Sequence, residues 1–394
     1  MIAPPWLPIP PKGYGGIENV LAGLVPELIM LGVKVELFTT GDSTIKATKR
    51  HWLYKTGQYS QIHKPQYDAL PISIAHLQFA LNAIKKDGGF DIIHDHNGFI
   101  GPLLFYNVHS EFPPVVHTLH GPPFTTADRL ELGIPDNLLM WKQFKYPNGL
   151  RIVPISEALG NAAPPNLKKQ MLPVVHNAVV AEDFPFIAKK ENYFITLARF
   201  HPEKGQHIAV KACLELGYNL KMAGGVSGIT SPKKLILEIG NPLSGYRSDM
   251  AFRYFSDHIF PHLELGQIEH LGEIKGERKL DLIKKAKGLL FPIAWDEPFG
   301  MAPIEALACG TPVIAMARGA LPEIVEHGVN GFLAKNESEF RHFMTKTNEI
   351  DPQACRDSVE RKFSGHMMAK KYLEHYKTVI QHHKKSRKQP LSGS

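Results

Sequence analysis

Residues 288–315 read GLLFPIAWDEPFGMAPIEALACGTPVIA, and this stretch decides the fold class. Residues 288–293 form a short, wholly apolar run, which is typical of a parallel strand covered on both faces. A helix is predicted over 303–309, with Pro303 in its first turn, and a second β-rich run follows at 311–315. The order strand, helix, strand indicates a βαβ unit and therefore a parallel sheet.

The same alternation extends along the rest of the chain. The second half adds strands at 193–197 and 219–223, with a helix at 205–216 between them. The first half adds helices at 17–31 and 72–86, and β-rich runs at 33–38, 91–94, 115–118, 151–155 and 173–176. Two series of βαβ units predict an α/β chain with two doubly wound domains.

Three segments do not follow this alternation. Residues 224–245 are rich in Gly, Ser and Pro and are expected to form a loop, whereas 351–380 reads mostly as a long helical segment. At the amino terminus, Pro4 and Pro5 leave only Met1–Ala3 for a first strand. Since the first strand of a doubly wound sheet is usually central, the chain begins with either a very short central strand or a truncated one.

Composition limits the function classes. A chain of 394 residues suggests two to three domains, and 43% hydrophobic residues exclude a mainly disordered chain. The net charge of +7 is modest, and part of it lies in the basic run 382–388. Three scattered cysteines, Cys213, Cys309 and Cys355, argue against a zinc site or a disulfide framework. No transmembrane run and no signal peptide are evident, so we expect a cytoplasmic protein.

The strongest chemical signal lies between the apolar strand and the helix that follows it. Gly300 loosens the turn, so the free amides of Gly300, Met301 and Ala302 should face the strand end and form an anion site. Glu297 precedes the helix and Glu305 lies within about its first turn. Glu297 can therefore contact a ligand in the crevice at the carboxyl ends of the strands, while Glu305 reaches the ligand from along the helix. The alternative for Glu305 is a favourable interaction with the helix dipole alone.

A pair of cations follows the first strand of the second half. Arg199 and Lys204 stand in the segment LARFHPEKG, between the strand and the next helix. They flank the same crevice as the glutamates and could clamp a pyrophosphate. The alternative is two solvated loop cations, which is the common state of Arg and Lys.

The first half contributes glycines and histidines. Gly15 and Gly16 form a glycine-rich loop at a helix start, where the backbone can approach a ligand closely. His120 lies where a strand gives way to a loop and should face a cleft between the domains. His94 and His96 also end a strand, and their spacing suggests either a metal site or, more commonly, polar structural residues.

Together these motifs resemble glycosyltransferase family 4, over nearly the whole chain from Ala3 to about Ile380. The most specific part is the block from Glu297 to Glu305, and the other motifs occur in the expected order. The opening residues also resemble bacterial members of the UDP-glucose:tetrahydrobiopterin glucosyltransferase type. The resemblance implies the GT-B architecture, in which two Rossmann-like doubly wound domains face a cleft.

The resemblance also implies a domain assignment. Residues 1–182 would form the N-terminal, acceptor-side Rossmann-like domain, and residues 183–355 the C-terminal, nucleotide-sugar-binding one. Residues 356–380 would be a helical segment that packs back on the N-terminal domain, and residues 381–394 a disordered basic tail.

The implied activity is a retaining, metal-independent transfer of a hexose, with glucose expected, from a nucleotide sugar, with UDP expected, to a hydroxyl acceptor. No cofactor is expected, because the nucleotide sugar is a substrate. In such enzymes the leaving phosphate is usually taken to deprotonate the acceptor, so no paired nucleophile and acid is required. Charge on the leaving diphosphate would be stabilised by fixed cations and helix amides.

Individual roles carry over residue by residue. The residues implied to be catalytic are His120, near the reacting sugar carbon, Arg199 and Lys204, on the leaving diphosphate, and Glu297, on the sugar hydroxyls. Glu305 would bind the ribose. The remaining donor-binding positions are the Gly15–Gly16 loop, Phe299 with the amides of Gly300, Met301 and Ala302, and, for the base, Leu271 and Ile274.

Other functions remain open at this point. A GT-B-type nucleotide-sugar epimerase would need a separate general base, and the motifs supply none near Glu297. A catalytically weak nucleotide-sugar-binding protein would bind without turnover. Nucleic-acid binding is poorly supported, because the basic run is confined to the tail and lacks interleaved aromatics. That tail could contact an anionic membrane weakly, but no amphipathic anchor accompanies it.

Overall fold

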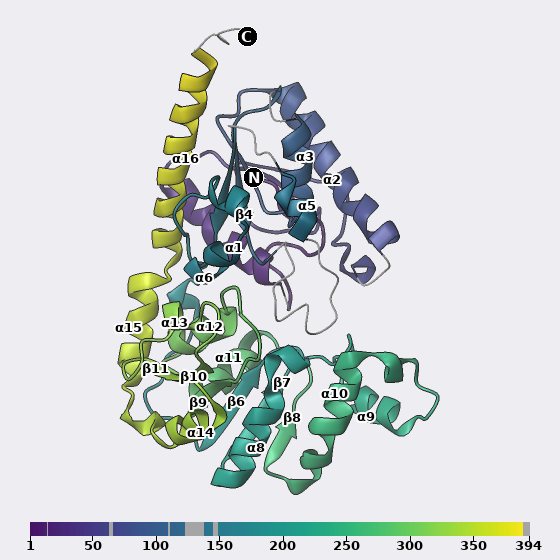
Figure 1. The fold of residues 1–394 in the computed structure, drawn as a ribbon, viewed down its shortest axis with the longest axis vertical. Coiled ribbons are helices and arrows are strands. Elements are labelled where there is room, and N and C mark those ends of the chain that lie inside the picture. Colours follow the sequence, from purple (N-terminus) through teal and green to yellow (C-terminus); the bar gives the residue numbers. More distant parts are fainter. Residues whose placement is uncertain (14, 63–65, 109–110, 123–137, 145–148, 389–394) are drawn as a thin grey trace. The chain divides into compact units, whose positions relative to one another are not determined.

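The computed structural model describes residues 1–13, 15–62, 66–108, 111–122, 138–144 and 149–388. The chain forms two compact units (Figure 1). The first unit combines Met1–Ala178 with the C-terminal segment Gly365–Ser394, and the second unit is Val179–Ser364.

The second unit is built on a six-stranded parallel sheet with the order β11-β10-β9-β6-β7-β8. This order is the doubly wound one, in which the chain returns to the middle of the sheet after three strands. The topological switch point therefore lies between β6 and β9, where Ile195 pairs with Leu289. The strands are β6 (Tyr193–Leu197), β7 (Asn219–Ala223), β8 (Ile268–His270), β9 (Gly288–Phe291), β10 (Val313–Met316) and β11 (Gly331–Ala334).

Helices cover both faces of this sheet. On one face a buried cluster joins the sheet to α8 (Gln206–Leu216), α10 (Met250–His258) and α14 (Glu337–Thr345). On the other face α12 (Met301–Ala308) packs against β9, β10 and α15 (Pro352–Lys362), with α11 (Gly276–Lys285) beside it. Coverage on both faces explains why β9 is wholly buried and wholly apolar. The smaller helices of the unit are α9 (Pro232–Gly240), α13 (Leu321–Ile324), η3 (Ala181–Asp183), η4 (Pro202–Lys204), η5 (Gly245–Ser248), η6 (Phe260–Leu265) and η7 (Thr347–Glu349).

The first unit repeats the same topology with a very short first strand. Ile2 makes parallel bridges to Phe38 of β1 and to Asp95 of β3, and its amide donates to His94 O at 2.8 Å. The amino-terminal residues thus occupy the centre of the sheet, which is the position expected for the first strand of a doubly wound sheet. The sheet runs β2 (Lys49–His51), β1 (Glu36–Phe38), Ile2, β3 (Ile93–Asp95), β4 (Val115–Leu119) and β5 (Leu150–Pro154).

The C-terminal helix completes the first unit. Helix α16 (Gly365–Lys388) packs along α1 (Gly16–Met30) and contacts β4 (Figure 1). No helix within the described residues is long and apolar enough to cross a membrane. The other helices of this unit are η1 (Tyr59–Gln61), α2 (Gln66–Asp87), α3 (Ile100–Val108), α5 (Leu138–Lys142), α6 (Glu157–Ala162) and α7 (Pro165–Lys168).

The structure corrects two of the sequence expectations. Residues 173–176 are not a strand, although the amide of Val175 donates to Pro154 O of β5 at 3.2 Å and Met171 bridges Ile152. The expected loop 224–245 contains helix α9, with Pro232 at its first position. Residues 351–380 are mostly helical, as expected, in two helices separated where the chain leaves helical geometry at Phe363 and Ser364.

The limits of the units also differ from the expected ones. Residues 356–362 belong to α15 and to the second unit, and the return to the first unit begins at Gly365. Helix α16 continues to Lys388, so the expected break at residue 380 falls inside a helix. The last turns are rich in Lys and Arg, which favour helices even where no apolar stripe continues.

Candidate active site

The charged motifs of the second unit lie at the switch point of its sheet. Arg199 and Lys204 follow the carboxyl end of β6, and Glu297 follows the carboxyl end of β9. Because β6 and β9 are parallel neighbours, their following loops emerge side by side. Ligands of doubly wound sheets bind in the crevice at such a point.

A close ion pair joins the two loops. The Nζ atom of Lys204 lies 2.6 Å from Oε2 of Glu297, and only 12% and 13% of the two side chains are exposed. The indole of Trp295 donates to the same carboxylate oxygen at 2.9 Å, and its ring lies 4.7 Å from the ammonium. An ammonium has three N–H donors, so Lys204 can keep this pair and still reach an anionic ligand. Trp295 is not among the residues predicted from the motifs.

Gly205 explains how the loops come so close. Its φ angle is +63°, and a Cβ atom there would lie 1.9 Å from the carbonyl oxygen of Pro292 in the loop after β9. Only glycine fits both the left-handed backbone and this approach. The amide of Ala294 also donates to Glu203 O at 2.8 Å, so the two loops form one hydrogen-bonded layer.

Arg199 differs from Lys204 in its surroundings. Its side chain is 53% exposed, and its closest carboxylate partner is Glu203, at 3.4 Å. Its backbone is held in place, because Gln206 Nε2 donates to Arg199 O at 2.9 Å. Without a ligand, Arg199 is therefore a largely solvated loop cation, whereas Lys204 is a mostly buried, paired one.

The amino terminus of α12 lies beside the ion pair. Gly300 is its N-cap residue with a φ angle of +99°, and no side chain of the described residues caps this end. The first amides of a helix lack intrahelical acceptors, so they can bind an anion. Met301 and Ala302 are half-buried. The Phe299 side chain, in contrast, is buried against Phe363, with ring centroids 5.8 Å apart, so Phe299 can offer a ligand only its backbone.

Glu305 lies deeper in the same helix. It is buried, and its Oε2 atom is 2.6 Å from Nζ of Lys279 on α11. Since α12 begins at Met301, Glu305 is in the second turn, where the helix dipole has little effect. The dipole alternative is therefore weak, and the ion pair with Lys279 fixes the carboxylate. The sequence analysis did not identify Lys279.

The turn after β8 lies at the same edge of the sheet. Leu271 donates its amide to Met222 O at 2.9 Å, and Glu273 donates to Thr230 O at 3.0 Å. Leu271 and Ile274 remain partly exposed. A partly exposed apolar pair with a fixed backbone can contact the flat face of a base.

In the first unit, the glycine loop begins helix α1. Gly15 is the N-cap residue, and a Cβ atom there would meet Pro11 at 2.7 Å, whereas Gly16 has open space around its Cα. The next acidic residue, Glu18, is buried, and burial raises its pKa to about 7. An acid that titrates near neutrality therefore lies next to the glycine loop. The sequence analysis did not identify it.

His120 follows β4 and is half-buried. Its Nε2 atom lies 2.9 Å from Nδ1 of His96, which follows β3. Burial is the main reason that the pKa of His120 falls to about 3 and that the pKa of His96 falls well below its ordinary value. Both imidazoles are therefore neutral across the physiological range, so these two rings offer hydrogen bonds without charge.

The His94–His96 spacing does not assemble a metal site. His94 uses both ring nitrogens for hydroxyl contacts, with Tyr376 at 2.6 Å and Thr118 at 2.7 Å. Within the described residues, no group of three or more His, Cys, Asp or Glu side chains is placed to hold a metal ion.

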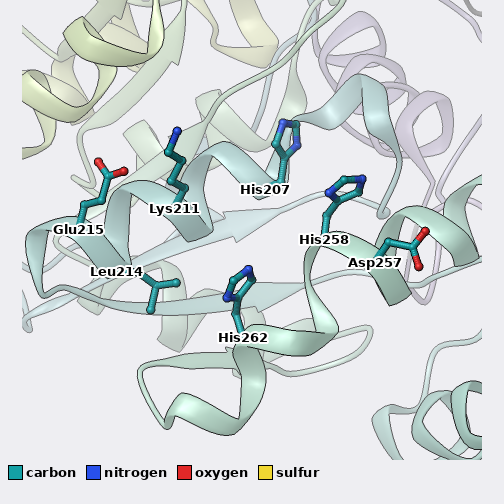
Figure 2. Close-up of a pocket in the computed structure, with 7 residues that line it drawn as sticks. All are labelled: His207, Lys211, Leu214, Glu215, Asp257, His258 and His262. Atoms are coloured by element: carbon teal, nitrogen blue, oxygen red, sulfur yellow. The ribbon is translucent and has the colours of Figure 1, made fainter.

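A surface hollow of about 370 Å³ lies elsewhere on the second unit, between α8 and the end of α10 (Figure 2). Imidazoles of His207, His258 and His262 line it from three elements, and none of the motif residues does. The ring of His207 is already engaged, because Nδ1 lies 2.9 Å from the hydroxyl of Tyr254. The hollow is thus distinct from the crevice at the switch point.

Two doubly wound units, the second with paired charges at its switch point, are the parts from which a GT-B-type glycosyltransferase is built. The comparisons agree: the model "Glycosyltransferase Family 4" matches residues 14–183, and the model "Glycosyl transferases group 1" matches residues 181–347. The chain belongs to glycosyltransferase family 4 and has the GT-B fold. Its general activity is glycosyl transfer from a nucleotide sugar.

Individual relatives are distant. The uncharacterized glycosyltransferase MJ1178 of Methanocaldococcus jannaschii is 26% identical over 295 residues, which cover 72% of this chain and 74% of the relative. Sucrose-phosphate synthase from Thermosynechococcus elongatus has a TM-score of 0.68 at 19% identity, covering 96% of this chain and 98% of that one. Anabaena Alr3699/HepE in complex with UDP-glucose has a TM-score of 0.61 at 15% identity, covering 96% and 98%. At these identities the solved structures establish the shared fold alone.

Proposed function

We propose that this chain transfers a hexose, namely glucose, from a UDP-sugar to an acceptor hydroxyl, with retention of the anomeric configuration and without a metal ion. The observation that carries the proposal is the buried Lys204–Glu297 pair at the switch point, next to the open amino terminus of α12. Cation, carboxylate and amides together suit a ligand that has both phosphate and hydroxyl groups.

The cations would act on the leaving group. Cleavage of the bond between sugar and phosphate leaves negative charge on the diphosphate. Lys204 and Arg199 would neutralise that charge, and the amides of Gly300, Met301 and Ala302 would donate to phosphate and sugar oxygens. Because Lys204 is held by Glu297 before any ligand binds, little reorganisation is needed as the charge develops.

The remaining residues would position the donor. Glu297 would accept hydrogen bonds from sugar hydroxyls, and Glu305, fixed by Lys279, from the ribose. Leu271 and Ile274 would contact the base. Each acceptor is a carboxylate, which forms stronger hydrogen bonds than a neutral group.

The first unit would supply the acceptor side and the contact to the sugar. His120 would contact the donor sugar near its reacting carbon, and the amide of Gly16 would approach the diphosphate. The leaving phosphate would take the proton of the acceptor hydroxyl on the same face of the sugar. A neutral His120 fits this scheme, since no side chain then has to act as general base.

The solved complex of Alr3699/HepE with UDP-glucose supports UDP-glucose as the first donor to test, through the shared fold. The acceptor is proposed only as a small molecule or glycan with a free hydroxyl.

The decisive experiment is a screen of UDP-, ADP- and GDP-sugars that measures nucleotide release without an acceptor. We expect the fastest release from UDP-glucose, and the same rate with and without a chelator. With an acceptor, NMR of the product should show the anomeric configuration of the donor. Loss of activity in chelator that manganese or magnesium restores would contradict metal independence, and binding without release would favour a non-catalytic binder.

A further inference from the structure

In the first unit, the rings of His96 and His120 share one hydrogen bond, and its direction has a chemical consequence. The atoms involved are Nδ1 of His96 and Nε2 of His120, 2.9 Å apart. Both rings are neutral, so one nitrogen of the pair carries the proton and the other accepts it. Two arrangements are therefore open.

The surroundings of His96 distinguish between them. Its side chain is completely buried, and its other nitrogen, Nε2, has no hydrogen-bond partner among the described residues. The neighbouring ring of His94, 4.0 Å away between centroids, offers no acceptor, because both of its nitrogens already contact hydroxyl groups. The proton of His96 is therefore either on Nδ1, where His120 can accept it, or on Nε2, where it is a buried donor without an acceptor.

The second possibility is the costlier one. If His120 donated to His96, the single proton of His96 would have to sit on Nε2, where nothing accepts it. Orphaned buried N–H groups are rare in proteins, and an unused acceptor lone pair is tolerated more often. The arrangement that leaves only a lone pair unused has the proton of His96 on Nδ1.

We infer that His96 is a positioning residue that donates Nδ1–H to Nε2 of His120 and so fixes the His120 tautomer with its proton on Nδ1. The hydrogen bond at one imidazole nitrogen determines which nitrogen carries the proton. His120 then offers its ligand an N–H donor and has no free basic nitrogen. That this ligand is the donor sugar rests on the proposed function, whereas the tautomer itself does not.

The C-terminal helix α16 holds the ring of His94, which lies beside His96. Tyr376 contacts Nδ1 of His94, and Tyr372 lies 2.7 Å from the Thr118 hydroxyl that contacts Nε2. His94 is thus fixed at both nitrogens and supports the face of His96. Helix α16 therefore helps to hold the positioning residue.

The direct test is the ring ¹⁵N spectrum of the histidine-labelled full-length protein, with His120 assigned from the signal that disappears in His120→Gln. We expect a protonated Nδ1 and an unprotonated Nε2 for His120. A protonated Nε2 would overturn the inference while leaving the proposed function intact. If no nucleotide sugar is bound or cleaved in the screen, the proposed function is wrong, but the inference about the His120 tautomer is unaffected.

A pair of substitutions tests the kinetic role. His96→Asn keeps a donor near the position of Nδ1, and His96→Leu removes it. We expect about a tenfold loss of kcat in His96→Leu, a loss of less than threefold in His96→Asn, and little change in KM. His76→Asn is the matched control, since His76 is equally buried in this unit but contacts Ala3 O, and it should keep normal turnover.

Equal kcat losses in His96→Asn and His96→Leu would contradict the inference, as would normal turnover in a folded His96→Leu variant. Melting temperatures of all three variants separate these outcomes from unfolding. If His96→Leu fails to fold, the ring spectrum of the unmodified protein still decides the question.

Discussion

The two units of this chain share one strand order and have opposite chemistry at their strand ends. In the second unit the edge has charged pairs, Lys204 with Glu297 and Lys279 with Glu305. In the first unit the corresponding edge has neutral imidazoles, among them His96 and His120. The same topology therefore provides a crevice for anions in one unit and a pair of neutral, hydrogen-bonded imidazoles in the other. Fold alone does not determine which.

The largest expected effect comes from removing a cation from the charged edge. Lys204→Ala or Arg199→Ala should lower kcat by about 10²–10³, equivalent to roughly 3–4 kcal/mol, because each removes a positioned donor from the leaving diphosphate. Lys204→Ala should also reduce stability by roughly 1–2 kcal/mol, since among the described residues the Glu297 carboxylate then keeps Trp295 alone as a side-chain donor. Turnover and melting temperature of the same samples measure both effects.

Lys211→Ala is the matched control for Lys204→Ala. Lys211 is on α8, its side chain is 62% exposed, and its nearest carboxylate, on Glu337, is 3.9 Å away. We expect wild-type turnover for this variant. If both Arg199→Ala and Lys204→Ala keep more than about half of wild-type turnover, the charged edge does not hold the diphosphate.

The second prediction concerns Glu18, the acid with a raised pKa that lies beside the glycine loop of the first unit. Burial raises the pKa of Glu18 from 4.5 to about 7, so the folded state binds its proton more tightly than the unfolded state does. The contribution of Glu18 to stability is therefore highest below about pH 4.5 and is lost as pH rises through 7. Glu18→Gln should stabilise the protein by up to about 3 kcal/mol at pH 8, and by close to nothing at pH 4.5.

Denaturant unfolding of Glu18→Gln and wild type at both pH values checks this. A stability difference that is the same at pH 4.5 and pH 8 would show that the gain has another origin, such as packing. A wild-type protein that becomes more stable between pH 5 and 7 relative to the variant would reverse the predicted sign.

The smallest expected effect concerns the deeper charged pair. Glu305→Gln keeps the shape of the side chain but weakens its hydrogen bonds to the ribose, so KM for the nucleotide sugar should rise about tenfold while kcat changes little. Lys279→Met should raise KM by less, because the carboxylate remains. Lys285→Met is the control on the same helix, since Lys285 forms an exposed pair with Asp281. A large fall in kcat with unchanged KM in Glu305→Gln would argue against a ribose contact.

Four of the six parallel strands of the second unit were predicted from the sequence, because buried parallel strands such as β9 consist of unbroken apolar residues, whereas β8 and β11 were missed. The β6 and β7 limits agree with the structure at both ends. Helix α9 was missed, since its surroundings are rich in Gly, Ser and Pro and only Leu235 in it is buried. The run at 173–176 was wrongly predicted to be a strand. Val175 donates one hydrogen bond to β5, but pairing does not continue along the run, and local β propensity does not report this.

For the site, sequence order could identify which residues end strands but not which side chains meet. Lys204 and Glu297 are 93 positions apart, and their contact depends on the β6–β9 pairing at the switch point. No sequence motif marks Trp295 or Lys279 as a site residue. Trp295 lies near Glu297, which belongs to a recognised motif, and Lys279 is one of many lysines in the chain. The buried state of Glu18 was equally hidden, because it follows from packing that brings distant segments together.

The return of α16 to the first unit has a consequence for synthesis on the ribosome. The strands β3 and β4 emerge early, but Tyr372 and Tyr376, which complete the hydrogen bonds of His94 and Thr118, are made only after the whole of Val179–Ser364. At typical translation speeds this delay is on the order of ten seconds or more. During that time the apolar face of α1 lacks its partner helix, so the early half of the chain is the part that nascent-chain chaperones would be expected to protect.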